Sequence, residues 1–173
     1  PTTSVPDSPG AAPASVRLPD AAHVGGLTLQ VSDLARSLGY YRDLLGLRVL
    51  VTSGDTARLG VPGSDAPLVT LHAVPGALPA GRRGAYGLFH FAILLPDRAS
   101  LGRFVAHLAA HGLRAGMSDH LVSEAIYLAD PDGLGIEVYA DRPRSTWQWE
   151  GGQLAMATEP LDVLPDLSEA LAR

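Results

Sequence analysis

The sequence predicts an α+β fold in which two βαβββ modules form a cupped mixed sheet around a cavity, with the helices outside. The first observation is a half-erased internal repeat, because the strand-like segments 26–31 and 90–95 are related by an offset of 90 − 26 = 64 residues. The second is that each segment is followed by a helical pattern and then by Gly-Leu-Arg, at 46–48 and 112–114. A chain of 173 residues is long enough for two such units to share one core.

In the first unit, apolar and polar residues alternate from Leu27 to Val31, which is the period of a half-buried strand. Ser32 or Asp33 can cap the helix that follows, and Gly46 can end it in the left-handed conformation. The apolar stripe of this helix recurs at i, i+4, i+7 and i+11, and consists of Leu34, Leu38, Tyr41 and Leu45. Three further strands, separated by turn residues, are expected at 49–52, 57–59 and 68–73.

The second unit repeats this order. A strand is expected from His90 to Leu95, followed by a helix from Ser100 to His111 and a stop at Gly112. The apolar face of this helix consists of Leu101, Val105 and Leu108. Two more strands are expected at 123–128 and 135–139, joined by the turn sequence Asp130-Pro131-Asp132-Gly133.

A loop rich in glycine and proline separates the two units and indicates a linker. We therefore expect one domain at 22–144, with module one at about 24–75 and module two at about 87–142. Residues 1–21 are expected to form a flexible N-terminal arm, and residues 145–173 a C-terminal tail.

Composition excludes several classes of function. The net charge of −5 provides no basic face, so nucleic acid is not an expected partner. The absence of cysteine excludes disulfides, thiolate metal sites and cysteine nucleophiles. No apolar run approaches the roughly 20 residues that span a membrane, and the N-terminus lacks the apolar core of a signal peptide. We therefore expect a cytoplasmic protein with no membrane partner.

His90 and Glu137 are the first candidates for a site, because the equivalent positions of the first unit hold Gly26 and Thr70. Burying an imidazole with a carboxylate is costly unless the two groups pair or bind a cation. The alternatives are a metal site and a hydrogen-bonded His–Glu pair with a structural role. The repeat favours the metal site, because it turns both positions toward a shared cavity.

His120 and Tyr127 are candidates for catalysis. A neutral histidine beside a metal-bound substrate can act as an acid or base, and a tyrosine hydroxyl can donate to a developing oxyanion. The alternatives are a surface histidine and a core tyrosine. For His72 we expect a buried side chain with a backbone partner, and for His107 and His111 a solvated helix face rather than a metal site.

The tryptophans of the tail, Trp147 and Trp149, are expected to cover a sheet end or a subunit contact. No phosphate-binding loop, nucleotide fingerprint or serine-nucleophile motif occurs in the chain.

Three segments carry a family resemblance. Residues 31–46, VSDLARSLGYYRDLLG, resemble the first-module signature of the vicinal oxygen chelate superfamily, which includes glyoxalase I, bleomycin resistance proteins and extradiol dioxygenases. Residues 87–98 and 118–143 resemble the catechol-2,3-dioxygenase branch of that superfamily. The resemblance implies a cavity between two βαβββ modules. It also implies Fe(II) or Mn(II) held by two histidines and one glutamate, with open positions for a vicinal diol and dioxygen.

Carried over by residue, the resemblance makes His90 and Glu137 metal ligands, His120 the acid/base histidine and Tyr127 the tyrosine beside the substrate. The third ligand position is degenerate, because it holds Gly26 or, in the other register, Thr28. The family's usual asparagine before the glutamate is Leu134 here, and this branch usually has a second pair of modules.

Two functional hypotheses follow. One is a metal-dependent extradiol dioxygenase that acts on a small aromatic vicinal diol. The other is a non-catalytic binding or sequestration protein for an aromatic or antibiotic ligand, in which the metal is weak or absent. A glyoxalase-type isomerase or lyase ranks last, because Gly26 and Thr70 remove two of its four usual ligands. In each case we expect a homodimer.

Overall fold

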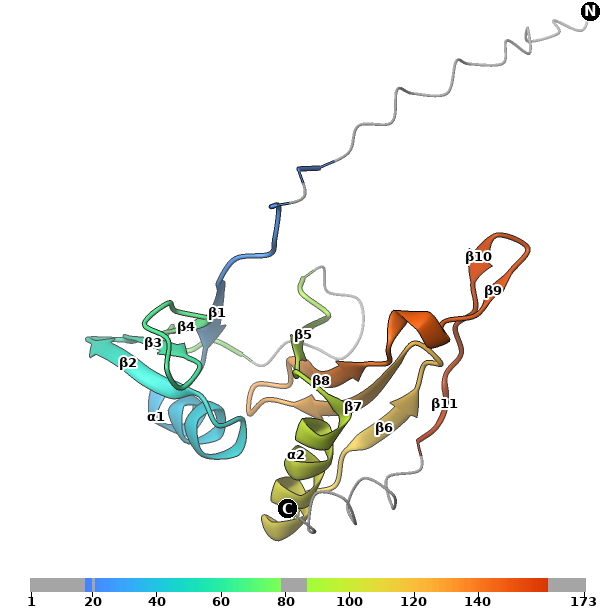
Figure 1. The fold of residues 1–173 in the computed structure, drawn as a ribbon. Helices are drawn as coiled ribbons and strands as arrows, with labels where there is room; N and C mark the ends of the chain where they lie inside the picture. Colours follow the sequence, from blue (N-terminus) through green and yellow to red (C-terminus); the bar gives the residue numbers. More distant parts are fainter. Residues whose placement is uncertain (1–17, 20, 79–86, 162–173) are drawn as a thin grey trace, which may run out of the picture.

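The computed structural model describes residues 18–19, 21–78 and 87–161, which form two large sheets, each with a helix against one face, and a separate two-stranded hairpin (Figure 1). This arrangement confirms the predicted α+β class with two βαβββ modules. The sheet is divided into a four-stranded and a five-stranded part, one for each module. Most of the predicted arm and the end of the predicted tail lie outside the described residues.

Module one contains a four-stranded sheet in the order β1-β4-β3-β2, with β1 parallel to β4 and the other pairs antiparallel. Its elements are β1 (Leu27–Val31), α1 (Leu34–Gly39), the π-helix η1 (Tyr40–Leu44), β2 (Arg48–Ser53), β3 (Thr56–Gly60) and β4 (Val69–Ala73).

Module two repeats this plan in a five-stranded sheet with the order β11-β6-β7-β8-β5. Its elements are β5 (His90–Leu94), α2 (Arg98–Ala110), β6 (Gly116–Asp119), β7 (Ser123–Ala129) and β8 (Gly135–Asp141). The tail adds the 3₁₀-helix η2 (Arg144–Thr146), the hairpin β9 (Trp149–Glu150) and β10 (Gln153–Leu154), and the edge strand β11 (Glu159–Pro160). The hairpin projects from the body of module two (Figure 1).

The strand registers confirm the internal repeat. In module one Thr70 lies between Thr28 on β1 and Arg58 on β3. In module two Glu137 lies between Ala92 on β5 and Tyr127 on β7. Each trio crosses its sheet in one row, and side chains in such a row share a face. The two modules therefore present equivalent rows with different chemistry.

The first helix differs from the prediction in its second half. Asp33 caps it by accepting a hydrogen bond from the Arg36 amide, but the α-helix ends at Gly39 and continues as a π-helix. The Leu45 amide accordingly donates to the Tyr40 carbonyl, five residues back. The wider turn lets Tyr41 and Leu44 both face the core. The spacing of apolar residues in the sequence does not indicate such a π-helical turn.

The core lies between each helix and its sheet, and the two halves form one cluster that spans both modules. Its largest fully buried side chains are Tyr41, Leu59, Leu71, Leu101, Leu108, Ile126 and Ile136. Along β8, Ile136 and Val138 are buried against α2, while Glu137 lies between them and points to the other face. Packing on one face thus fixes the direction of the polar residues on the other.

The predicted Asp-Pro-Asp-Gly turn between β7 and β8 joins the modules. Asp132 accepts hydrogen bonds from the Ser32 amide at 2.8 Å, from the Ser32 hydroxyl at 2.5 Å and from Arg36 Nη2 at 2.5 Å. The buried Asp130 accepts one from the Tyr41 hydroxyl at 3.0 Å. Ser32 is therefore not the helix cap but a contact between the modules.

Within the described ranges, no helix has the length and apolar character needed to cross a membrane.

Candidate functional site

His90 and Glu137 meet on the face of the module-two sheet that α2 leaves open. His90 begins β5, and Glu137 lies in the neighbouring parallel strand β8. His90 Nε2 is 3.2 Å from Glu137 Oε2, and the two side chains are 37% and 15% exposed. Gly135, directly across from His90, permits this approach, because a Cβ at that position would lie 2.9 Å from the His90 Cβ. The predicted proximity of the two residues is therefore found.

Tyr127 extends the pair. It lies on β7 directly opposite Glu137, and its hydroxyl donates a hydrogen bond to Glu137 Oε1 at 3.2 Å. Its side chain is half-buried, and burial raises the pKa of the Tyr127 hydroxyl, with a further rise from the charge and the hydrogen bond of Glu137. The hydroxyl thus keeps its proton and remains a donor in the neutral pH range.

His120 contacts Tyr127 from the other side and extends this hydrogen-bonded group of side chains. It follows β6, and its Nε2 lies 2.7 Å from the Tyr127 hydroxyl. Its Nδ1 lies 2.7 Å from the Ala157 carbonyl, which only accepts, so Nδ1 carries a proton. Residue 157 is placed by the pairing of β11 with β6. Sequence reasoning missed Ala157, because a backbone acceptor leaves no signature in the side chains.

The four side chains form one continuous chain from His90 through Glu137 and Tyr127 to His120. Tyr127 has one hydroxyl proton and two potential acceptors within reach, so it donates to only one of them. The other contact is a hydrogen bond only when His120 Nε2 or the Glu137 carboxyl carries a proton and donates it to the Tyr127 oxygen. The group can therefore hold a proton on either side of the Tyr127 hydroxyl, at His120 Nε2 or at the Glu137 carboxylate.

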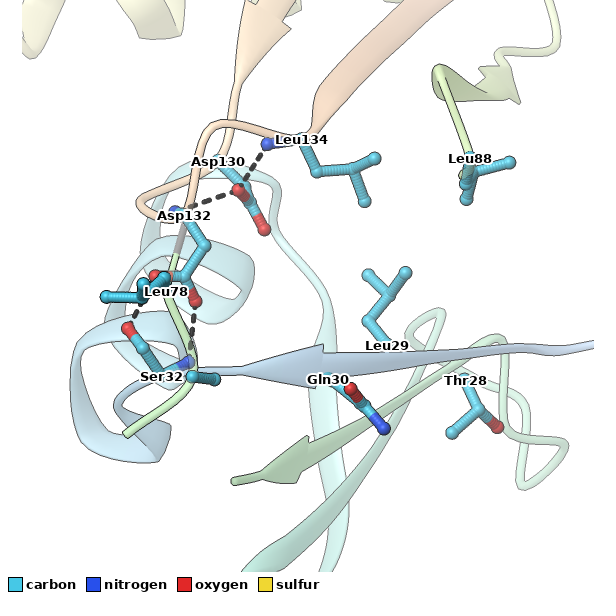
Figure 2. Close-up of a pocket in the computed structure, with 10 residues that line it drawn as sticks. Thr28, Leu29, Gln30, Ser32, Leu78, Leu88, Asp130, Asp132 and Leu134 are labelled. Atoms are coloured by element: carbon cyan, nitrogen blue, oxygen red, sulfur yellow. Dashed lines mark hydrogen bonds between the residues drawn. The ribbon is translucent and has the colours of Figure 1, made fainter. Parts of the chain in front are cut away.

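A cleft of about 370 Å³ lies between β1 and the β7–β8 turn. It is lined by Thr28, Leu29, Gln30, Ser32, Ala77, Leu78, Leu88, Asp130, Asp132 and Leu134. Figure 2 shows Leu29 and Leu134 pointing toward one another across it. The carboxylates of Asp130 and Asp132 are already committed to Tyr41, Ser32 and backbone amides. The cleft is therefore mainly an apolar space between the modules, and His90 and Glu137 are not part of its lining.

The comparisons with known proteins identify the family. The model of the Glyoxalase/Bleomycin resistance protein/Dioxygenase superfamily matches residues 21–138. The chain belongs to this superfamily. A relative named catechol-2,3-dioxygenase, from Bacillus subtilis (strain 168), is 46% identical over 149 residues, which cover 86% of this chain and 52% of the relative. The chain thus spans about half the length of that curated relative.

Solved structures of the superfamily share the fold. A glyoxalase/dioxygenase from Nostoc punctiforme has a TM-score of 0.58 and 23% identity, covering 75% of this chain and 99% of its own. Lactoylglutathione lyase from Agrobacterium tumefaciens has a TM-score of 0.55 and 21% identity, covering 70% and 96%. The fosfomycin resistance protein FosX from Mesorhizobium loti has a TM-score of 0.51 and 18% identity, covering 71% and 95%. At these identities the likeness concerns the fold alone.

The superfamily's metal chemistry can be tested against the residues present. Two ligands at about 2.0–2.2 Å from one ion and roughly at right angles to each other lie about 3 Å apart. His90 Nε2 and Glu137 Oε2, at 3.2 Å, match that spacing. Within the described ranges, no three His, Cys, Asp or Glu side chains lie close enough together to hold a metal ion. Gly26 and Thr28, at the third ligand position, provide neither an imidazole nor a carboxylate. The residues fit a two-ligand site, with the third place open.

The remaining histidines do not join this row. His72 was expected to be buried with a backbone partner; it is exposed instead, and its Nδ1 lies 3.0 Å from Thr56 Oγ1, because β4 turns this position away from the core. His111, the residue that caps the end of α2, is exposed as expected. His107 was expected on a solvated helix face but is half-buried, and its Nε2 lies 3.2 Å from the Asp43 carbonyl of module one.

In the tail, the indole of Trp147 donates to the Arg142 carbonyl, and Trp149 is 64% exposed.

Proposed function

We propose that this superfamily member binds Fe(II) or Mn(II) through His90 and Glu137 and acts on a small aromatic vicinal diol as an extradiol ring-cleaving dioxygenase. The observation that carries the proposal is the continuous row of His90, Glu137, Tyr127 and His120 on one face of one sheet. The relative named catechol-2,3-dioxygenase supports the reaction class.

Each residue has a defined task in this proposal. His90 and Glu137 hold the ion, which supplies Lewis acidity toward the diol oxygens and the redox chemistry that dioxygen requires. The Tyr127 hydroxyl, held protonated by its surroundings, donates to negative charge that develops on a substrate oxygen. His120 accepts or returns a proton at Nε2, because its Nδ1 proton is committed to Ala157.

A matched pair of variants tests the metal site. The full chain is loaded with Fe(II) without oxygen and desalted, and its iron content is measured for the wild type, Glu137→Gln and His72→Gln. Glu137→Gln should bind Fe(II) at least about tenfold more weakly, since it loses a charged ligand. His72→Gln, on the exposed face of module one, should bind like the wild type. Equal iron retention by Glu137→Gln and the wild type would contradict the proposal.

A second candidate function is a non-catalytic binding protein for an aromatic or antibiotic ligand. It is favoured by the missing third ligand at Gly26 or Thr28 and by the apolar walls of the cleft. A catechol assay for the yellow ring-opened product separates the two candidates. Binding of catechol by the iron-loaded chain without ring opening would favour the binding protein.

We also propose that the chain forms a homodimer. Large apolar side chains are exposed on module two and its tail, among them Phe89 at 87%, Trp149 at 64% and Met156 at 61%. Exposed apolar patches commonly mark contacts between subunits. Sedimentation at micromolar concentration should show twice the mass of 18.0 kDa, and a monomer would rule the dimer out.

A further inference from the structure

The two sheets of this chain have opposite charge. None of the residues in β1 to β4 is acidic, and these strands carry Arg48 and Arg58. The five-stranded sheet of module two instead carries five carboxylates, those of Asp119, Glu124, Glu137, Asp141 and Glu159. In a chain of net charge −5, a sheet without carboxylates is locally favourable for an anion.

Arg58 lies at the centre of the module-one sheet. Its neighbours in sequence, Ala57 and Leu59, are buried against the helix, so Arg58 points to the opposite face, where it is exposed. Polar side chains surround it on that face because the registers place them in two adjacent rows. These are Thr28, Thr70 and Arg58 in one row, and Gln30, His72 and Thr56 in the other.

The Arg58 guanidinium has no hydrogen-bond or ion-pair partner within the described ranges. Almost every other arginine there has one. Arg36, Arg42, Arg48, Arg98 and Arg142 pair with carboxylates, Arg103 donates to Ser100, and Arg144 lies over the ring of Trp147. Besides Arg58, only Arg114, in the loop between α2 and β6, has neither such a partner nor a ring contact among the described residues. Arg58 is thus an uncommitted cation in a row of hydroxyl groups.

We propose that this face of module one binds the carboxylate of a small aromatic acid, with the Arg58 guanidinium as its ion-pair partner. A planar guanidinium binds a carboxylate through two parallel hydrogen bonds. The hydroxyls of Thr28 and Thr70 lie in the same row and provide further donors. The aromatic ring lies against the same face, over the adjacent row of Gln30, His72 and Thr56.

The internal repeat supports this assignment. Arg58 occupies in module one the position that Tyr127 occupies in module two, because each faces the central residue of its row, Thr70 or Glu137. One sheet therefore offers a cation-binding row and the other an anion-binding row. The carboxylate site needs neither metal nor diol, and so goes beyond the function proposed above.

Two ligands of similar shape, one charged and one uncharged, test the proposal. Benzoate and benzamide are titrated into the metal-free full chain at low ionic strength, and the amide signals of β3 and β4 are followed by NMR. Benzoate should bind at least about tenfold more tightly than benzamide, the fold-change typical of a charge-assisted hydrogen bond. Arg58→Gln should remove that preference, and Arg58→Lys should retain part of it. Arg114→Gln, which makes the same change of net charge elsewhere, should leave it unchanged.

Equal affinity for benzoate and benzamide overturns the proposal, as does an unchanged preference in Arg58→Gln or an equal loss in Arg114→Gln. A parallel titration of the iron-loaded chain with catechol keeps the two ideas separate. Catechol binding without a preference for benzoate overturns the carboxylate site and leaves the metal function standing. A preference for benzoate that depends on Arg58, in a chain that retains no iron, supports the carboxylate site alone.

Discussion

The Tyr41 hydroxyl donates a hydrogen bond to Asp130 Oδ2 at 3.0 Å across the boundary between the two modules, and both residues are buried. Asp130 Oδ1 accepts from the amides of Asp132 and Leu134, so Tyr41 is the partner that satisfies the second oxygen. A buried carboxylate oxygen without a partner is expensive. This bond therefore ties the π-helix of module one to the β7–β8 turn beside the cleft.

Tyr41→Phe should lower the free energy of unfolding by about 1–3 kcal/mol, because it leaves Asp130 Oδ2 buried and unpaired. Urea denaturation at neutral pH measures the change. Tyr139→Phe is the matched control, since the Tyr139 hydroxyl has no hydrogen-bond partner among the described residues, and it should change stability by less than about 0.5 kcal/mol. Equal effects of the two variants would show that the bond adds little to stability.

The sequence predicted most of the scaffold, because the scaffold depends on periodicity and turn chemistry. The strand at 27–31, the helix of module two and the turn after Ala129 follow from alternation, an apolar stripe and an Asp-Pro-Asp-Gly run. The strand β6 was missed, because Gly-Met-Ser-Asp has neither strong strand propensity nor alternation. Its position is set by pairing with β7, which is a tertiary effect.

The candidate site was predictable as a set of residues but not as a connected row. The repeat singled out His90 and Glu137 because it compares equivalent positions, and the registers then place Tyr127 beside them. The contact of His120 with Ala157 depends on a tail strand of two residues, which no local pattern indicates. The contacts of Asp132 with Ser32 and Arg36 bridge about 100 residues and were equally hidden. The roles in metal binding and catalysis stay predictions.

Stability should decrease at high pH through Tyr40. Burial, and secondarily the charge of Asp130, raises the pKa of Tyr40 from 10.0 to about 12. The folded state thus favours the protonated hydroxyl. Its contribution is fully present below pH 10, where both states are protonated, and is lost as the pH rises through about 12.

Urea denaturation between pH 9 and pH 12 should therefore show a falling free energy of unfolding, with a shallower fall in Tyr40→Phe. The absorbance of tyrosinate provides an independent reading. If all five tyrosines of the wild type ionised together near pH 10, the burial of Tyr40 would play no part.

Gly135→Ala should disrupt the pair of His90 and Glu137. A Cβ at position 135 would lie 2.9 Å from both the His90 Cβ and the Phe89 carbonyl, so β5 or His90 must shift. Such crowding costs about 1–3 kcal/mol of stability, and the shift should weaken Fe(II) binding. Gly116→Ala is the control, because its Cβ would lie 3.5 Å from the Tyr127 Cβ, an ordinary contact. Isothermal titration calorimetry of both variants with Fe(II) checks the prediction. The prediction is wrong if the two variants bind Fe(II) with the same affinity.

Gly26→His should increase Fe(II) retention. The repeat makes position 26 equivalent to His90, so the introduced histidine would supply the third ligand. The substitution has a structural cost. A Cβ at Gly26 would lie 3.0 Å from the Pro67 carbonyl oxygen, so the backbone must give by a few tenths of an ångström. Gly26→His should therefore melt below the wild type while holding more iron. Thr28→His tests the other register, and its exposed position should leave stability unchanged.

Iron content after anaerobic loading and desalting, read beside the thermal midpoint, separates gain of a ligand from loss of structure. The variant that retains more iron should also open catechol to its yellow product faster than the wild type, because two residues of the row, Tyr127 and His120, are already in place. Rapid turnover by the wild type would show that water in the third position suffices. If neither variant gains iron, His90 and Glu137 form a structural pair, and the binding-protein alternative takes precedence.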